Sequence, residues 1–130
     1  MKLKAIRNLS AIMVVSFMAS CSPKMVGTWT VQRFETTQPG KPGVALSNIG
    51  TIQFNKNGTG EKNIHYTALG TTFEDQKPFK WSSSDGKYMT IDGEGSEFSK
   101  TWIIMTDKKK FQKWKTTDGT NNIQIIELVK

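Results

Sequence analysis

Few side chains in this sequence are equipped for catalysis. His65 is the only histidine, and it falls on the polar side of an alternating segment, which predicts a solvent-facing ring rather than a base or a ligand. The serine run 82–84 has no basic partner in sequence, and no Gly-x-Ser-x-Gly motif occurs. Oxygen ligands in 92–97 could hold calcium, but their spacing is not that of an EF-hand, which favours a glycine-rich hairpin. We therefore expect no enzyme, metal or cofactor.

One residue has a chemistry of its own, because of what precedes it. Cys21 is the only cysteine, and it follows three positive charges within residues 1–7 and an apolar run over residues 9–19. This arrangement is typical of a cleaved secretory signal peptide. The apolar run is about half of the roughly 20 residues that a transmembrane helix needs.

The four residues that end this leader, Met18-Ala19-Ser20-Cys21, resemble the lipobox of bacterial lipoproteins. They depart from its commonest form at Met18, where leucine is usual, and at Ser20, where glycine or alanine is usual. The resemblance implies that residues 1–20 are removed and that Cys21 carries the lipid. Each buried methylene of an acyl chain contributes about 0.8 kcal/mol, so two or three chains anchor a protein firmly. The alternative is an ordinary signal peptide with a bystander thiol.

The remaining 110 residues suffice for one domain. Loss of Lys2, Lys4 and Arg7 with the leader lowers the formal charge from +7 to +4. An exported chain of this moderate charge is not expected to meet nucleic acid. The lysine run 108–110 is interpreted as a solvated hairpin tip that contacts anionic headgroups weakly. With Cys21 lipidated no internal disulfide can form, so stability must come from the apolar core.

Residues 21–25 are expected to form a short lipidated tether, and residues 26–130 a single β domain. The apolar pattern beyond the tether has a period of two residues between turn residues, with no segment typical of a helix. Residues 70–76 are left open as strand or loop, and 37–47 is expected to be a Pro/Gly-rich loop. Eight short strands are predicted: 26–36, 49–55, 59–69, 78–83, 87–92, 97–106, 110–116 and 122–129.

An antiparallel up-and-down meander of about eight strands avoids exposed edges by closing into a small barrel, whose interior is filled or holds one small ligand. Two strands leave their register open. Phe111 and Trp114 are three residues apart, so a regular strand would point them to opposite faces. This implies a bulge or a rim position for one of them. In the last strand, isoleucines of both parities imply either two covered faces or a shifted register.

Gly27-Thr28-Trp29 resembles the GxW motif of lipocalins, in which the tryptophan closes the base of the barrel. Residues 106–111 are similar to the lipocalin TDYxxY element without its first tyrosine. The chain from residue 26 onward is similar to the short lipocalin-like domain lipoproteins of Bacteroidetes, with Phe79-Lys80-Trp81 and a late Lys-Trp at 113–114 among the shared phrases. No arginine occurs after Arg33, so Lys113 or Lys115 is expected to replace in part the late lipocalin arginine that stacks on this tryptophan.

The resemblance implies a calycin-like barrel that binds a small hydrophobic or amphipathic molecule, with Gly27 and Trp29 as the structural base. The predicted lining residues are aromatic, and Tyr66 is their one polar group; they are Phe54, Tyr66, Phe79, Trp81 and Trp102. The alternative is a protein-interaction or enzyme-inhibitor module with a filled barrel, acting on an envelope protein through residues 37–47. A lipid on Cys21 would hold either form in the bacterial cell envelope, at the outer membrane and facing the periplasm.

Overall fold

The computed structural model describes residues 23–117, 119 and 121–130. The predicted signal peptide and Cys21 lie outside these residues. A short 3₁₀ helix, η2 (Pro23–Met25), leads into nine strands. The strands are β1 (Gly27–Thr37), β2 (Val44–Phe54), β3 (Thr59–Ala68), β4 (Thr71–Asp75), β5 (Phe79–Ser84), β6 (Tyr88–Asp92), β7 (Thr101–Lys108), β8 (Phe111–Thr117) and β9 (Ile123–Val129).

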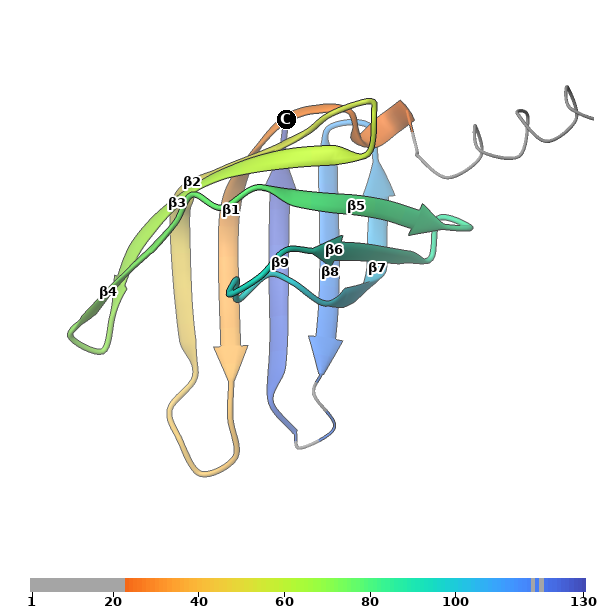
Figure 1. Cartoon of the computed structure of the whole chain (residues 1–130). Helices are drawn as coiled ribbons and strands as arrows, with labels where there is room; N and C mark the ends of the chain where they lie inside the picture. Colours follow the sequence, from red (N-terminus) through yellow and green to blue (C-terminus); the bar gives the residue numbers. More distant parts are fainter. Residues whose placement is uncertain (1–22, 118, 120) are drawn as a thin grey trace, which may run out of the picture.

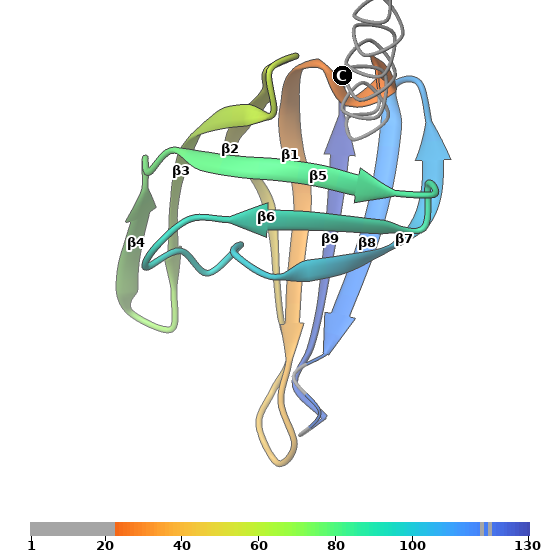
Figure 2. The same ribbon diagram turned by 45° about the vertical axis from the view of Figure 1, so that its right-hand side comes forward.

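Eight of these strands form a closed antiparallel barrel, and β4 is an extra strand at its side. Consecutive barrel strands pair with each other, β9 pairs with β1, and the pairing of β2 with β3 completes the ring. Both β4 and β5 pair with the same edge of β3, where they are separated by residues 76–78. Figure 1 shows β5 crossing in front of β8, and in the turned view of Figure 2 both β5 and β6 cross in front of β1, β9 and β8. The all-β barrel expected from the sequence is thereby confirmed.

The barrel has two different ends. The base end carries η2 and the turns 55–58, 85–87 and 109–110, whereas the open end carries the loops 38–43 and 93–100 and the tip of the β3–β4 hairpin. The chain terminus marked C in Figure 1 lies at the base end, beside η2. Ligands of a barrel enter at the end that the chain does not close, so the open end is where a site is sought.

Two segments differ from their predicted structure. Residues 44–47 were expected in a loop, but they belong to β2 and pair with residues 33–36 of β1, which confines the loop to 38–43. Residues 97–100 were expected in a strand, but they lie in the loop before β7. There the backbone N–H of Phe98 donates to Ser96 Oγ over 3.1 Å, and the Ser99 hydroxyl donates to the Gly93 carbonyl. These local bonds compete with the strand ladder.

Bulges explain the register that the sequence left open. β7 is irregular between Ile104 and Thr106, opposite β8. In β8 the buried side chains are Gln112, Trp114 and Thr116, so Phe111 faces outward and is half-buried. The last strand alternates regularly, with Gln124, Ile126 and Leu128 buried and its odd-numbered side chains half-buried on the outer face.

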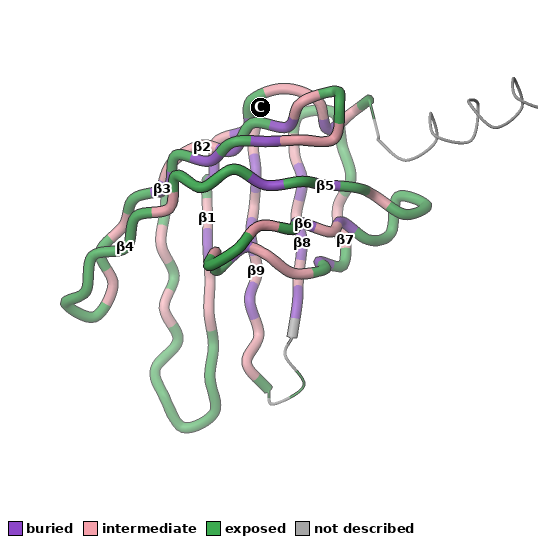
Figure 3. Tube along the Cα trace, in the orientation of Figure 1, coloured by how far each residue is buried: buried purple, intermediate pink, exposed green. Residues whose placement is uncertain are grey.

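The core holds all four tryptophans, and each indole N–H has an acceptor. Trp29 donates to the Met25 carbonyl over 2.9 Å, Trp102 to the Phe98 carbonyl over 3.0 Å and Trp114 to Gln112 Oε1 over 3.1 Å. Trp81 donates to the carbonyls of Asn55 and Thr59. Figure 3 shows the buried positions along the middle of the strands and the exposed ones at the loops. A buried indole costs free energy unless its N–H is bonded, so these contacts fix the rings as packing elements.

Gly50 allows the close approach of β2 and β3 that closes the ring. Its φ is 140°, and a Cβ there would lie 2.0 Å from the Asn63 carbonyl oxygen. A side chain at this position would therefore push the two strands apart, at the place where β2 leaves one side of the barrel for the other.

Candidate functional site

A pocket of about 280 Å³ opens at the mouth of the barrel, between the ends of β1 and β2 and the β3–β4 hairpin. Most of its lining is apolar, and its polar groups are the hydroxyl of Tyr66, the carboxylate of Glu97 and the side chains of three further residues. The lining consists of Phe34, Thr36, Gln38, Val44, Leu46, Tyr66, Ala68, Leu69, Thr71, Phe73 and Glu97.

Aromatic rings form one wall and the floor of this pocket. The rings of Tyr66 and Phe73 stack with centroids 5.0 Å apart and planes 22° apart. The ring centroid of Phe34 lies 6.1 Å from that of Tyr66 and 5.2 Å from that of Phe98. The side chain of Phe98 is almost fully buried. Phe34 therefore joins the lining of the pocket to Phe98, a residue of the buried core.

The loop that carries Phe98 is held by a buried charged group. Lys62 Nζ lies 3.2 Å from Asp75 Oδ2 and donates to Ser96 Oγ over 2.8 Å. The Ser96 hydroxyl donates to Asp75 Oδ2 over 2.6 Å. The Lys62 side chain is fully buried, and its ammonium lies 5.5 Å from the centroid of Phe79. A buried ammonium is tolerated only when it is paired and hydrogen-bonded, so this group ties the loop to β3 and β4.

A second polar chain crosses the mouth from β9. The buried amide of Gln124 donates from Nε2 to Glu97 Oε1 over 2.6 Å, and its Oε1 accepts a hydrogen bond from Lys100 Nζ. The Lys100 ammonium also lies 5.6 Å from the centroid of Trp102. Gln124 therefore separates Lys100 from Glu97, and among the ion pairs of the described residues none includes Glu97.

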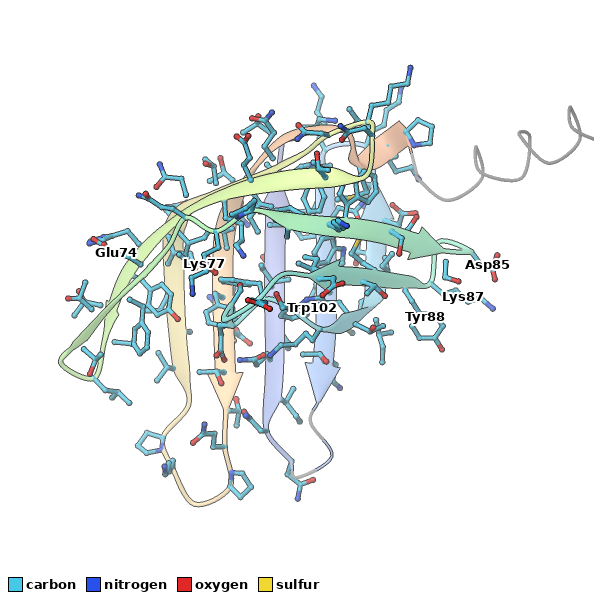
Figure 4. All side chains as sticks on the ribbon, viewed as in Figure 1. Glu74, Lys77, Asp85, Lys87, Tyr88 and Trp102 are labelled. Atoms are coloured by element: carbon cyan, nitrogen blue, oxygen red, sulfur yellow. The ribbon has the colours of Figure 1, made fainter. Side chains whose placement is uncertain are left out.

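A smaller pocket of about 170 Å³ adjoins the first and shares Tyr66, Phe73 and Glu97 with it. Its other lining residues include two more carboxylates, those of Glu74 and Asp75. Figure 4 shows Glu74 on β4, far across the molecule from Tyr88. Burial of the Tyr66 hydroxyl, followed by the negative charges of Glu97 and Asp75, raises the pKa of this phenol.

Comparison with known proteins identifies the family. The model of the lipocalin-like domain family matches residues 25–128. The chain belongs to this family. No curated protein and no solved structure matches the chain. Proteins with this fold are generally binding proteins rather than enzymes, and a family assignment on its own names no ligand.

Of the five predicted lining residues, Tyr66 lines the pocket at the mouth. The other four, Phe54, Phe79, Trp81 and Trp102, are at most 4% exposed and line neither pocket described above. The Phe54 ring makes edge contacts with Phe79 and Trp81 at 5.4 Å each. These rings fill the lipocalin-like barrel as a small barrel requires.

Sequence reasoning missed Phe34, because the strand has an irregularity that a strict period of two does not show. A strict period of two that starts from Trp29 and Val31 places Arg33, not Phe34, on the inward face. The register shifts between Val31 and Arg33, so Phe34 turns inward and is 3% exposed. Phe73 and Glu97 were missed because their segments were left open or assigned to a strand. To place Phe73, one must know that β4 pairs with β3. To place Glu97, one must know that the hydrogen bonds of Ser96 hold this segment as a loop.

The family motifs lie at the base end. A Cβ at Gly27 would lie 2.8 Å from Lys130 Cε, and Lys130 Nζ lies 5.1 Å from the centroid of Trp29. Lys130 thus takes the place that the sequence assigned to Lys113 or Lys115, which project outward from β8. In the TDYxxY-like element, the Asp107 carboxylate accepts from Gln112 over 2.6 Å and lies 3.3 Å from Lys24 Nζ.

Part of the segment expected to be a tether belongs to the domain. Met25 is 2% exposed and its carbonyl accepts the Trp29 indole N–H. No group of three or more His, Cys, Asp or Glu among the described residues is placed to hold a metal ion. Within that same part of the chain, none of the helices has the length and apolar character needed to cross a membrane.

Proposed function

We propose that this protein binds a small apolar or amphipathic molecule, without chemical change, in the pocket at the open end of the barrel. The observation that carries the proposal is the pocket lined by Phe34, Tyr66 and Phe73, in which Phe34 packs against the buried ring of Phe98. Its volume of about 280 Å³ suits a molecule of one or two rings or a short chain, since sites for drug-sized ligands begin at roughly 300 Å³.

The test uses the full chain with Cys21→Ser and a neutral fluorescent probe, N-phenyl-1-naphthylamine. We expect saturable binding at one site per chain. Ala68 lines the pocket and Thr67, its neighbour on β3, is exposed. Ala68→Trp should therefore fill the site and weaken binding at least about tenfold, because the apolar area available to the ligand is lost. Thr67→Trp is the matched control and should bind as the parent does.

Equal binding by Ala68→Trp and its control would place the probe elsewhere and reject this site. Absence of saturable binding by any neutral probe, together with a protein that copurifies in stoichiometric amount from the native host, would instead favour the interaction module. The loop 38–43, exposed at every position, is where such a partner would be sought.

We further propose that the lipocalin-like barrel is held at the outer membrane by a lipid on Cys21, facing the periplasm. For the orientation of the barrel the support is geometric: η2, with which the described chain begins, lies at the base end (Figure 1), and the residues that line the pocket belong to the open end. Two residues of extended chain reach about 7 Å, so a lipid on Cys21 would hold the base end against the bilayer and leave the mouth pointing away. Mass spectrometry of protein from the native membrane tests this, because the intact N-terminal peptide must carry diacylglycerol and acyl masses that Cys21→Ser lacks.

A further inference from the structure

The charged residues that line the two pockets at the mouth of the barrel are all acidic. Among the described residues that line the larger pocket, Glu97 alone is charged, and the smaller pocket adds Glu74 and Asp75 with no lysine or arginine. This is unusual for the chain, because its formal charge is +7 and it carries 18 Lys and Arg against 11 Asp and Glu. A cleft lined by charges of one sign concentrates ligands of the opposite sign.

The three carboxylates differ in the side chains that already contact them. Asp75 is paired with the buried ammonium of Lys62, and Glu74 lies 3.6 Å from the ring of His65 on the outer side of β3. Glu97 accepts one hydrogen bond from the neutral amide of Gln124 and pairs with no cation in the described chain. A carboxylate has about four acceptor positions, so Glu97 retains acceptor capacity at the edge of the larger pocket.

The rings that surround this carboxylate favour the same kind of ligand. Phe34, Tyr66 and Phe73 present aromatic surface within one pocket, and the faces of such rings attract cations within about 6 Å of their centroids. The barrel uses this contact three times already, with lysines over Phe79, Trp102 and Trp29. The pKa of the Tyr66 phenol is raised first by burial and then by the negative charges of Glu97 and Asp75, which oppose formation of a phenolate. The same negative charges would attract a cationic ligand.

From this geometry we infer that the ligand of the mouth pocket is an amphipathic cation, an aromatic or short aliphatic molecule with one ammonium group, whose charge is received by Glu97 while its apolar part lies against Tyr66 and Phe73. The inference rests on the proposed function, since it names the ligand class of the same pocket.

The test compares three probes that share a naphthalene ring and differ in the group it carries: 1-naphthylmethylamine, 1-naphthalenemethanol and 1-naphthoic acid. Their dissociation constants are measured by calorimetry with the full chain carrying Cys21→Ser, at pH 7 and low salt. We expect the ammonium probe to bind at least about fivefold more tightly than the alcohol, and the carboxylate most weakly. Because surface charges are screened, the preference should shrink as salt is raised to 1 M.

Glu97→Gln isolates the charge. The side-chain amide oxygen introduced by this substitution can still accept a hydrogen bond from Gln124 Nε2. The structure of the loop is therefore preserved while the negative charge is removed. We expect the affinity of the ammonium probe relative to the alcohol to fall below about twofold. Glu94→Gln is the matched control, because Glu94 is exposed on the same loop and lines neither pocket. It should retain the full preference.

The outcomes separate the two proposals. If the alcohol binds but the ammonium probe binds no better, or if its advantage survives Glu97→Gln, the cation inference is overturned and the pocket stands. If none of the three probes binds, the pocket itself is rejected and the inference falls with it. Loss of the preference in both Glu97→Gln and Glu94→Gln would assign it to the general field of the loop and overturn the specific role of Glu97.

Discussion

Lys130 Nζ lies 5.1 Å from the ring centroid of Trp29 and donates to the Val26 carbonyl over 2.6 Å. The last residue of the sequence therefore covers the tryptophan that closes the base of the barrel. Its aliphatic stem passes Gly27, where a Cβ would lie 2.8 Å from Lys130 Cε. The two residues of the GxW motif thus have separate roles. Gly27 leaves space for the side chain of Lys130, and the ring of Trp29 makes a cation–π contact with its ammonium group.

Replacing this lysine should lower stability modestly. We expect Lys130→Met to lower the free energy of unfolding by about 1 kcal/mol, because an exposed cation–π contact contributes about 0.5–1 kcal/mol and a hydrogen bond a similar amount. Lys130→Arg should retain most of that free energy. Urea denaturation followed by tryptophan fluorescence measures it, and Lys109→Met at the exposed hairpin tip is the control. A loss no larger than that of the control would show that the charge over Trp29 contributes nothing.

The buried pair of Lys62 and Asp75 should behave non-additively. Asp75→Asn leaves a fully buried ammonium without its counter-charge, so we expect a loss of about 3 kcal/mol in the free energy of unfolding. Adding Lys62→Met removes the stranded charge, and the double variant should be more stable than Asp75→Asn alone. A double-mutant cycle by urea denaturation measures the coupling. If the two losses simply add, the pair is not energetically coupled.

Tyr66 should make stability fall in alkaline solution. Burial and the charges of Glu97 and Asp75 raise the pKa of its phenol, whereas an unfolded tyrosine ionises near pH 10. The unfolded chain therefore loses this proton first, so the contribution is fully present below pH 10 and is lost as pH rises through the folded pKa.

The ultraviolet absorbance of phenolate measures this titration directly. The chain has two tyrosines, so Tyr88→Phe leaves Tyr66 as the only phenol. We expect it to ionise above the pH of free tyrosine, and Glu97→Gln to lower its pKa without restoring the ordinary value, since burial is the largest cause. Titration at the ordinary value in the folded protein would contradict the half-buried position of this residue beside Glu97 and Asp75.

The lysines of the base end should strengthen contact with anionic bilayers. Lys24 is joined to Asp107 at 3.3 Å, and the exposed lysines 108–110 follow directly. Each lysine near an anionic surface contributes about 1 kcal/mol. Changing Lys108, Lys109 and Lys110 to glutamine should therefore weaken cosedimentation of the Cys21→Ser chain with phosphatidylglycerol vesicles at least about tenfold.

A matched triple variant carries the same loss of charge away from the base end, at Lys41, Lys77 and Lys115. It should bind anionic vesicles close to the parent level. Equal weakening by both triple variants would show that only total charge matters and that the base end has no special part in membrane contact.

The sequence alone determined the class of fold, because a period of two residues broken by turn residues permits strands and excludes helices along most of the chain. The sequence also located the base motif, through the resemblance of Gly27 and Trp29 to the GxW motif of lipocalins at the head of the first predicted strand. Six of the eight predicted strands match the observed bounds to within one residue at each end. The predicted strand 49–55 lacks residues 44–48 of β2. The predicted strand 97–106 begins four residues too early, where the side chains of Ser96 and Ser99 bind the local backbone instead of a neighbouring strand.

The candidate site was decided only by the tertiary structure. Aromatic residues that look alike in sequence separate into a filled core, with Phe54 and Trp102, and a mouth, with Phe34 and Phe73, according to a bulge after Val31 and the pairing of β4 with β3. The charge of the mouth depends on which lysines find partners elsewhere: Lys62 pairs with Asp75, and Lys100 donates to Gln124. Within the described part of the chain, Glu97 is left with the neutral amide of Gln124 and no cation. Such pairings join residues far apart in the chain, and periodicity carries no information about them.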